Sequence, residues 1–233
     1  MEKYLYLGLI AFTFFGPLSR SFESRIRYIQ YWRSLLVGTL AVLVVFIPWD
    51  VFFTAQGHWG FSNRYVVGWK PLGLPIEEWL FFVAVPFACM FIYEVINLFF
   101  PWTDRGQKWP RVTAWILLVT AALGAAAFAE RAYPALTFAL TALALALVLR
   151  YRVSWLGPFF RGWAISLVPF FLINGVLTGT GLDEPVVWYN NQENMGIRLG
   201  TIPAEDAFYG MFMMLLYTSA VEWHRTRSKK TNV

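Results

Sequence analysis

Long apolar runs alternate with short polar segments along almost the whole chain. A helix of about 20 apolar residues crosses the hydrocarbon core of a bilayer, which is about 30 Å thick. The pattern therefore predicts about seven transmembrane helices, and the expected fold class is an all-α, polytopic membrane helical bundle. The predicted spans are Tyr4–Leu18, Ser34–Phe53, Ile76–Phe100, Val112–Ala132, Pro134–Leu149, Trp163–Leu177 and Pro203–Trp223.

The boundary between the fourth and fifth spans depends on few residues. Only Glu130, Arg131 and Pro134 interrupt a long Ala/Leu-rich region there. Proline removes a backbone donor and breaks the helical hydrogen-bond ladder, so a tight turn near Tyr133–Pro134 is expected. A single bent helix is the alternative.

Composition supports the membrane assignment. Hydrophobic residues make up 58% of the 233 residues and charged residues only 14%, whereas a soluble domain has about 25% charged residues. The single cysteine, Cys89, lies inside an apolar run, so no internal disulfide can form. The N-terminal apolar run lacks a small-residue cleavage pattern and is interpreted as the first span, not as a cleaved signal.

The distribution of basic residues predicts the orientation in the membrane. Cytoplasmic loops are enriched in Lys and Arg, and 14 of the 19 basic residues follow the first, third, fifth and seventh spans. We therefore expect the protein in the cell inner membrane, with its N-terminus outside and its C-terminus in the cytoplasm. The net charge of +5 reflects this orientation, so no nucleic-acid partner is expected. These 14 residues are Arg20, Arg25, Arg27, Arg33, Arg105, Lys108, Arg111, Arg150, Arg152, Arg161, Arg225, Arg227, Lys229 and Lys230.

The sequence contains an internal duplication. Pro75-Ile-Glu77-Glu78 matches Pro203-Ala-Glu205-Asp206 at an offset of 128 residues. Upstream, Asp50-x-x-x-Thr54 resembles Asn174-x-x-x-Thr178 at an offset of 124. The domain organisation predicted from these matches is a first repeat of three helices in residues 1–111, a connector helix in 112–133, and a second repeat of three helices in 134–233. Three spans plus one connector return the chain to its starting side, so the repeats are parallel.

The acidic pairs of the duplicated motif are the candidate catalytic residues. Glu77 and Glu78 begin the third span, and Glu205 and Asp206 begin the seventh. Charged groups at membrane depth are costly and suggest function, although carboxylates after a proline also complement a helix N-terminus. The second copy favours a working site. One ionised carboxylate disfavours ionisation of its neighbour, so each pair is expected to hold a proton and act as a general acid.

Aromatic residues surround these acids in the sequence. Aromatic faces stabilise cations by roughly 0.5–2 kcal/mol each, which suits carbocation chemistry on a polyene, although Trp and Tyr also form interfacial belts in any membrane protein. The aromatic candidates for substrate binding are Trp59, Phe61, Phe82, Trp188 and Tyr209.

Polar residues near the acids complete the candidate site. Asp50 and Asn174 are expected to orient the acids or accept a proton, or else to be polar helix ends. Arg198 precedes the second acidic motif and is expected to pair with a carboxylate. Glu94 and Glu222 are also related by the offset of 128. Because they lie about 24 Å beyond the acidic motifs at 1.5 Å per residue, they are interpreted as anchors or ion-pair partners at the inner interface.

Several functional classes lack their motifs. No G-x-G-x-x-G, Walker or D-D-x-x-D sequence is present, and His58 and His224 are far apart with no Cys/His cluster. We therefore expect no cofactor and no metal. The seventh span contains no lysine for a retinal Schiff base.

The motifs together resemble the membrane lycopene cyclase family, the non-flavin cyclases that occur as heterodimers in some bacteria and as fused chains in archaea, other bacteria and fungi. The resemblance covers essentially the whole chain and is to the fused form. It rests on Trp49-Asp50, Gly57-His-Trp-Gly-Phe61, Leu74-Pro-Ile-Glu-Glu78, Phe81-Phe82, Asn174-Gly-Val-Leu-Thr-Gly-Thr-Gly181, Glu184-Pro-Val-Val-Trp-Tyr-Asn190 and Gly196-Ile-Arg-Leu-Gly-Thr-Ile-Pro-Ala-Glu-Asp206.

The resemblance implies an isomerase (intramolecular lyase) of carotenoid biosynthesis that converts the ψ-ends of lycopene to β-rings, giving γ-carotene and β-carotene without a redox change. Lycopene or a related acyclic carotenoid would be the substrate, and the lipid bilayer, a second copy or other enzymes of carotenoid synthesis would be partners. One composite site between the repeats is favoured over two independent sites.

Two other classes of function remain open. A proton-coupled transporter is one, since duplicated bundles with buried carboxylates also build carriers; against it, the acids cluster at one interface. A non-catalytic carotenoid-binding scaffold is the other. The sequence is compatible with β-, ε- and γ-ring products.

Overall fold

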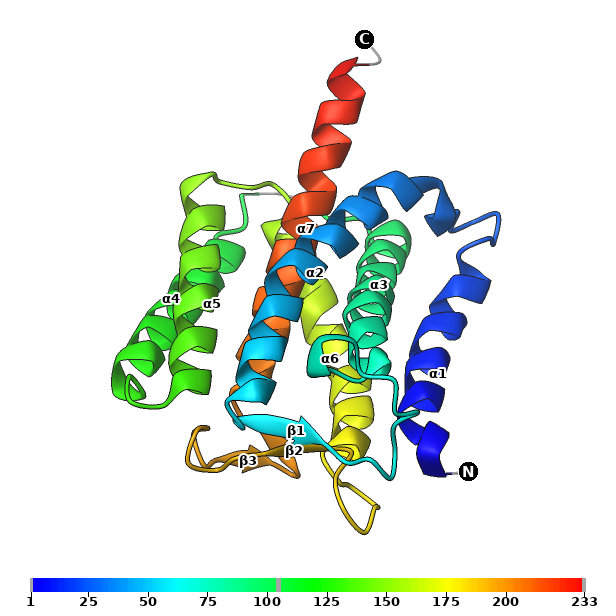
Figure 1. Cartoon of the computed structure of the whole chain (residues 1–233). Coiled ribbons are helices and arrows are strands. Elements are labelled where there is room, and N and C mark those ends of the chain that lie inside the picture. The colour runs from blue at the N-terminus through cyan, green and yellow to red at the C-terminus, as the bar shows by residue number, and fades with distance from the viewer. Residues whose placement is uncertain (1, 104–105, 232–233) are drawn as a thin grey trace.

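The computed structural model describes residues 2–103 and 106–231; Arg105 and the side chains of residues 229–231, which include Lys229 and Lys230, lie outside the described part. Over these residues the chain is an all-α bundle of seven α-helices (Figure 1). The helices are α1 (Leu5–Arg20), α2 (Trp32–Ala55), α3 (Ile76–Phe99), α4 (Trp109–Ala127), α5 (Ala132–Arg150), α6 (Leu156–Leu177) and α7 (Asp206–Thr231). Short 3₁₀ turns lie at Glu2–Tyr4, Tyr28–Tyr31 and Pro71–Gly73, and the four strands are β1 (Trp59–Phe61), β2 (Val187–Tyr189), β3 (Arg198–Leu199) and β4 (Ile202–Pro203).

The predicted helices are confirmed, with differences at their ends. Helix α6 begins at Leu156, seven residues before the expected Trp163, and α7 continues past Trp223 to Thr231. The fourth and fifth spans are two helices and not one bent helix, but the turn lies at residues 128–131, before the expected Tyr133–Pro134. Pro134 stands in the first turn of α5, where its missing N–H removes no intrahelical hydrogen bond.

Five of the described helices, α2 to α6, are long and apolar enough to cross a membrane. Helix α1 has only 16 residues, and the far half of α7 carries several charged residues. Both helices lie in the same bundle as the other five, and the two termini lie at opposite ends (Figure 1). We call the end that carries the N-terminus and the strands the strand end.

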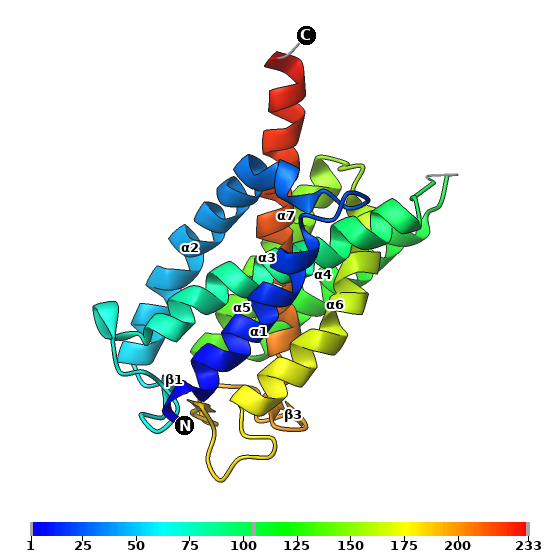
Figure 2. The ribbon, with the colours of Figure 1, turned by 90° about the vertical axis from the view of Figure 1, so that its right-hand side faces the viewer.

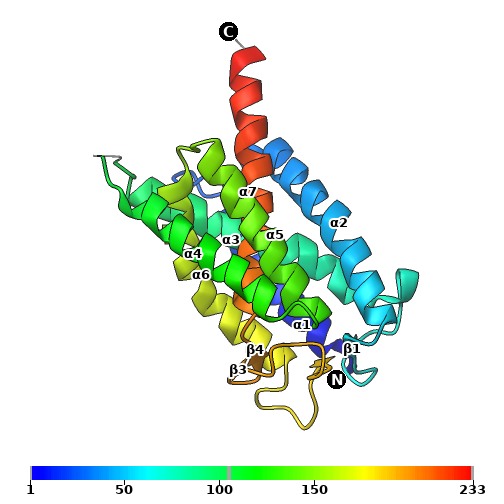
Figure 3. The ribbon, with the colours of Figure 1, turned by 90° about the vertical axis from the view of Figure 1, so that its left-hand side faces the viewer.

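The two halves of the bundle have the same arrangement of helices, and helices of one half pack against helices of the other. Helices α1, α2 and α3 run in the same directions as α5, α6 and α7, as expected for a parallel duplication (Figures 1 and 3). The second helix of each half packs against the third helix of the other, α2 on α7 and α6 on α3. Helix α4 packs mainly on α5, at one side of the bundle. The halves therefore share one core.

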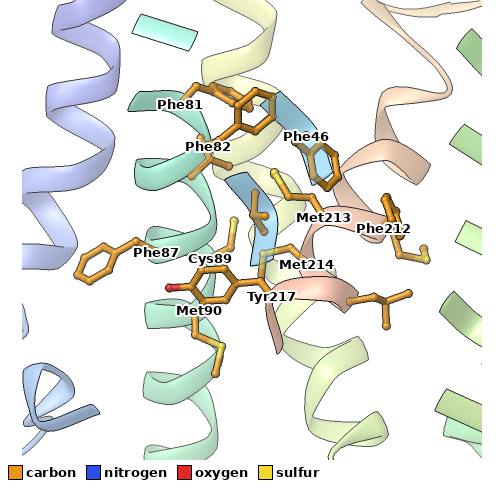
Figure 4. Packing of buried hydrophobic residues seen from close by; sticks show 14 of the residues in the cluster. Phe46, Phe81, Phe82, Phe87, Cys89, Met90, Phe212, Met213, Met214 and Tyr217 are labelled. Atoms are coloured by element: carbon orange, nitrogen blue, oxygen red, sulfur yellow. The ribbon is translucent and has the colours of Figure 1, made fainter. Parts of the chain in front are cut away.

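Large apolar side chains fill the contact between α2, α3 and α7 (Figure 4). Phe46, Phe82 and Tyr217 are fully buried there, and the Tyr217 hydroxyl donates a 3.1 Å hydrogen bond to the Leu35 carbonyl oxygen. A Cβ at Gly38 would lie 2.9 Å from Val221 Cγ2, so this glycine permits the close approach of α2 and α7.

A short antiparallel ladder joins the outer loops of the two halves at the strand end. Trp59 pairs with Tyr189, Gly60 with Trp188, and Phe61 with Val187. A Cβ at Gly60 would overlap the Trp188 indole ring, so only glycine fits there. The ladder places aromatic side chains of both halves over the helix ends that carry the acidic motifs.

An ion-pair network ties the helices at the opposite end. Arg225 contacts Glu94 at 2.6 Å and Glu222 at 3.1 Å, and its guanidinium lies 4.2 Å from the centre of the Tyr31 ring. This geometry agrees with the expectation that the two glutamates are ion-pair partners.

Candidate active site

One cavity at the strand end receives residues from six of the seven helices. It has a volume of about 490 Å³, including its opening. Its polar lining comes from both halves of the chain: Tyr6, Asp50, Glu78, Tyr133, Asn174, Tyr189 and Asp206. Its apolar and aromatic lining includes Trp59, Phe61, Phe81, Phe170, Leu177, Val187 and Tyr209. We call this cavity the acid chamber.

The first half contributes two carboxyl groups to the acid chamber. Tyr6 of α1 donates a short hydrogen bond to Glu78 Oε2, and Trp59 Nε1 donates to Asp50 Oδ1 at 2.5 Å. Asp50 and Glu78 lie close enough to interact directly. Asp50 Oδ2 has no hydrogen-bond donor among the described residues.

The second half contributes one carboxyl group with three donors. Asp206 accepts hydrogen bonds from the Tyr133 hydroxyl at 2.5 Å, from Asn174 Nδ2 at 3.0 Å and from the Tyr189 hydroxyl at 3.2 Å. Tyr189 lies on β2, outside the spans. Burial, followed by the charge of Asp206, raises the pKa of Tyr189 well above its usual value, so its hydroxyl stays neutral and can donate.

The two sets of contacts follow the duplication. Tyr6 and Tyr133, 127 positions apart, each donate to the second acid of their own half. Asp50 and Asn174, 124 positions apart, each lie beside that acid. The halves differ in this last pair, because one has a carboxyl group where the other has an amide.

The first acid of each pair points away from the acid chamber. Glu77 Oε1 accepts a 2.6 Å hydrogen bond from the Val67 backbone N–H, and Glu205 Oε1 accepts one of 2.9 Å from Met195 N–H. Both glutamates are fully buried, and neither borders the cavity. Successive residues of a helix point about 100° apart, which separates the two members of a pair. Glu77 and Glu205 thus hold the outer loops.

Some of the predicted substrate-binding residues line the acid chamber and others do not. Asp50, Trp59, Phe61, Asn174 and Tyr209 line the acid chamber.

The other three predicted substrate-binding residues do not border the acid chamber. Phe82 is buried in the helix core, and Trp188 lies over Gly60 with 43% of its surface exposed. Arg198 was expected to pair with a carboxylate. Instead it donates hydrogen bonds to the Thr201 carbonyl oxygen at 2.6 Å and to Asn191 Oδ1 at 2.7 Å. It therefore braces its own loop.

Sequence reasoning missed two tyrosines of the acid chamber. Tyr6 was not singled out, and Tyr133 was considered only as part of a turn. The signal was available, because the two lie 127 residues apart, each near the start of the first helix of a repeat. Among the described residues, no group of three His, Cys, Asp or Glu side chains is placed to hold a metal ion.

Comparison with known proteins agrees with the duplication. A family model described as lycopene cyclase matches residues 3–96 and 130–224, and the two matched segments begin 127 residues apart. No curated protein and no solved structure matches the chain.

Proposed function

Because the chain belongs to the lycopene cyclase family, we propose that it closes the ψ-ends of lycopene into β-rings by acid catalysis without a redox change. The observation that supports this best is the acid chamber, where carboxyl groups of both repeats meet in a buried, aromatic-lined cavity. One composite site therefore serves both repeats.

The proposed reaction adds one proton and removes one. Protonation of C2 leaves a cation at C1. The C5–C6 double bond attacks it, forming the C1–C6 bond and moving the cation to C5. Loss of the C6 proton restores the C5–C6 double bond in the ring. No electron acceptor is needed, because the product is an isomer of the substrate.

Asp50 and Glu78 are the proposed proton source. Two neighbouring carboxyl groups in a buried cavity are stable when they share one proton, and Asp50 Oδ2, beside Glu78, has no hydrogen-bond donor among the described residues. C2 and C6 are both bonded to C1 in the product ring. The same carboxyl pair can therefore deliver the first proton and take up the second, which returns the site to its starting state.

Asp206 is the proposed partner of the cation. Its three hydrogen bonds fix the carboxylate toward the cavity, and preorganised negative charge stabilises positive charge that develops in a transition state. The rings of Trp59, Phe61 and Tyr209 line the same cavity and contribute roughly 0.5–2 kcal/mol each by cation–π attraction.

The proposed orientation places the acid chamber at the non-cytoplasmic side of the cell inner membrane. The strand end has few basic residues, whereas most of them follow α1, α3, α5 and the apolar part of α7. The N-terminus is then outside and the C-terminus in the cytoplasm.

Expression in lycopene-accumulating cells tests the function. The unmodified chain should form γ-carotene and β-carotene, whereas Glu78→Gln and Asp206→Asn should insert normally and form neither. Glu130→Gln, an exposed carboxylate in the α4–α5 turn, is the matched control and should stay active. Lycopene left unchanged by the unmodified chain would indicate a carrier or scaffold, and ring formation by both site variants would refute the assigned residues.

A further inference from the structure

An apolar groove runs beside the acid chamber, between α1, α3 and α6. It has a volume of about 740 Å³, including its open side. Both α1 and α6 pack on α3, and Figure 2 shows the three helices together on this face of the bundle. Phe81, Phe170 and Asn174 line both the groove and the acid chamber, so the two spaces adjoin.

The lining of the groove suits a hydrocarbon. Besides Asn174, which is already bonded to Asp206, its polar side chains are Thr13 and Cys89. The Thr13 hydroxyl donates to the Leu9 carbonyl oxygen at 2.9 Å, within its own helix. The groove therefore offers an occupant almost no free polar partner.

The groove extends from the acid chamber toward the middle of the membrane. On α3 its lining runs from Phe81 to Ile92, which is about 16 Å at 1.5 Å per residue. That is roughly half of a hydrocarbon core of about 30 Å. On the α1 side Gly16 and Phe12, which is 76% exposed, leave the groove open to the lipid.

At three of the matching positions the other half of the chain carries larger side chains. Small groove residues of α3 correspond to bulky residues of α7, and an aliphatic residue of α6 corresponds to a tryptophan of α2. By the offsets of 128 and 124, the pairs are Ala88 and Leu216, Cys89 and Tyr217, and Ile173 and Trp49. Tyr217 and Trp49 are buried in the core. The face between α1, α3 and α6 therefore has an open groove, whereas larger side chains occupy the equivalent positions in the other half.

We infer that the groove between α1, α3 and α6 binds the polyene arm of the substrate while the end to be cyclised lies in the acid chamber. This inference rests on the proposed function and deepens it. A linear polyene has no hydrogen-bonding groups, fits a narrow apolar groove, and reaches it laterally from the bilayer. A single groove leading to a single chamber binds one end of the carotenoid at a time.

Two glycines of α1 allow a matched test. A Cβ at Gly16, in the groove, or at Gly8, outside it, would meet nothing within 4 Å, so a side chain can be added at both positions without a clash at its first atom. Gly16→Leu should lower the initial rate of ring formation by roughly tenfold or more, as expected when a bulky side chain competes with a bound ligand. Gly8→Leu should leave the rate unchanged, and Gly16→Ala should lie between them.

Carotenoid binding gives a second measurement, independent of turnover. In the Glu78→Gln background, lycopene that co-purifies with the protein is quantified by its visible absorbance per protein. Adding Gly16→Leu should remove most of it, and adding Gly8→Leu should not. Equal rates and equal bound lycopene for the two leucine variants would overturn the groove assignment alone. Failure of the unmodified chain to form rings would overturn the proposed function, and the groove's role with it.

Discussion

The hydroxyl of Tyr133 provides the sharpest test of how the acid chamber works. Tyr133→Phe removes only the 2.5 Å hydrogen bond to Asp206 Oδ1. The ring remains, with its edge-on packing at 5.1 Å from Trp59 and 6.0 Å from Tyr209. The change therefore alters how Asp206 is held without opening a cavity.

The expected loss follows from the strength of that bond. A hydrogen bond to a charged group contributes about 1.5–3 kcal/mol, and about 1.4 kcal/mol corresponds to tenfold in rate. Asp206 keeps its bonds from Asn174 and Tyr189, so it stays in place but is held less firmly toward the cation. Ring formation should fall roughly ten- to a hundredfold.

The assay is the initial rate of γ-carotene and β-carotene formation from lycopene in isolated membranes, per amount of protein. Tyr217→Phe is the matched control, because it removes another buried tyrosine bond, to the Leu35 carbonyl oxygen, away from the acid chamber. It should reduce stability but not the rate. An unchanged rate in Tyr133→Phe, or an equal loss in both variants, would refute the role assigned to this hydroxyl.

Three further predictions concern other parts of the molecule. Asp50→Asn, which copies the amide of the second half, should slow ring formation strongly because Glu78 loses the carboxyl group with which it shares a proton; product analysis in membranes checks this. Arg225→Met should lower the free energy of unfolding by roughly 3–5 kcal/mol, because it leaves two largely buried carboxylates without their cation. The variant should therefore show shorter half-times of thermal inactivation than the unmodified chain, while its rate of ring formation at low temperature is retained. The hydrogen bond with Arg64 lowers the pKa of the Glu2 carboxyl below its usual 4.5. Above pH 4.5 the carboxylate is ionised and the contact with Arg64 is fully formed. The contact is lost as the pH falls through the lowered pKa of Glu2. Protease access to the N-terminal segment should rise only in that acidic range, and Arg64→Gln should remove the dependence.

Apolar periodicity and the duplicated motif were enough to predict the helices and the parallel repeat, and they singled out Glu78 and Asp206, which the fold brings to one cavity. These features depend on local sequence and on its recurrence. The direction in which each acid points was beyond such reasoning. Helix α3 is apolar on nearly all sides, so no polar stripe in the sequence tells that Phe81 lines the acid chamber while Phe82 enters the core.

The hydrogen bonds that Tyr6 and Tyr133 donate to the acids could not be predicted from the sequence either, because they depend on tertiary contacts. Each lies on a helix that packs against the acid-bearing helix of its own half, and a tyrosine at a helix start also fits an interfacial belt. The role of Glu205 depended on a contact with the Met195 backbone, which only the folded loop creates.

The exchange of helices between the halves has a consequence for symmetry. Two identical repeats with α2 on α7 and α6 on α3 would form a two-fold arrangement in which every residue change appears twice. A substitution that fills the groove of one repeat would then also fill the groove of the other repeat. Likewise, a change from aspartate to asparagine in one repeat would also occur in the other. Carrying both repeats on one chain frees each copy to vary alone, as Asn174 opposite Asp50 and Tyr217 opposite Cys89 illustrate. The two repeats can therefore differ in their side chains because each is encoded separately, although both fold into one shared bundle.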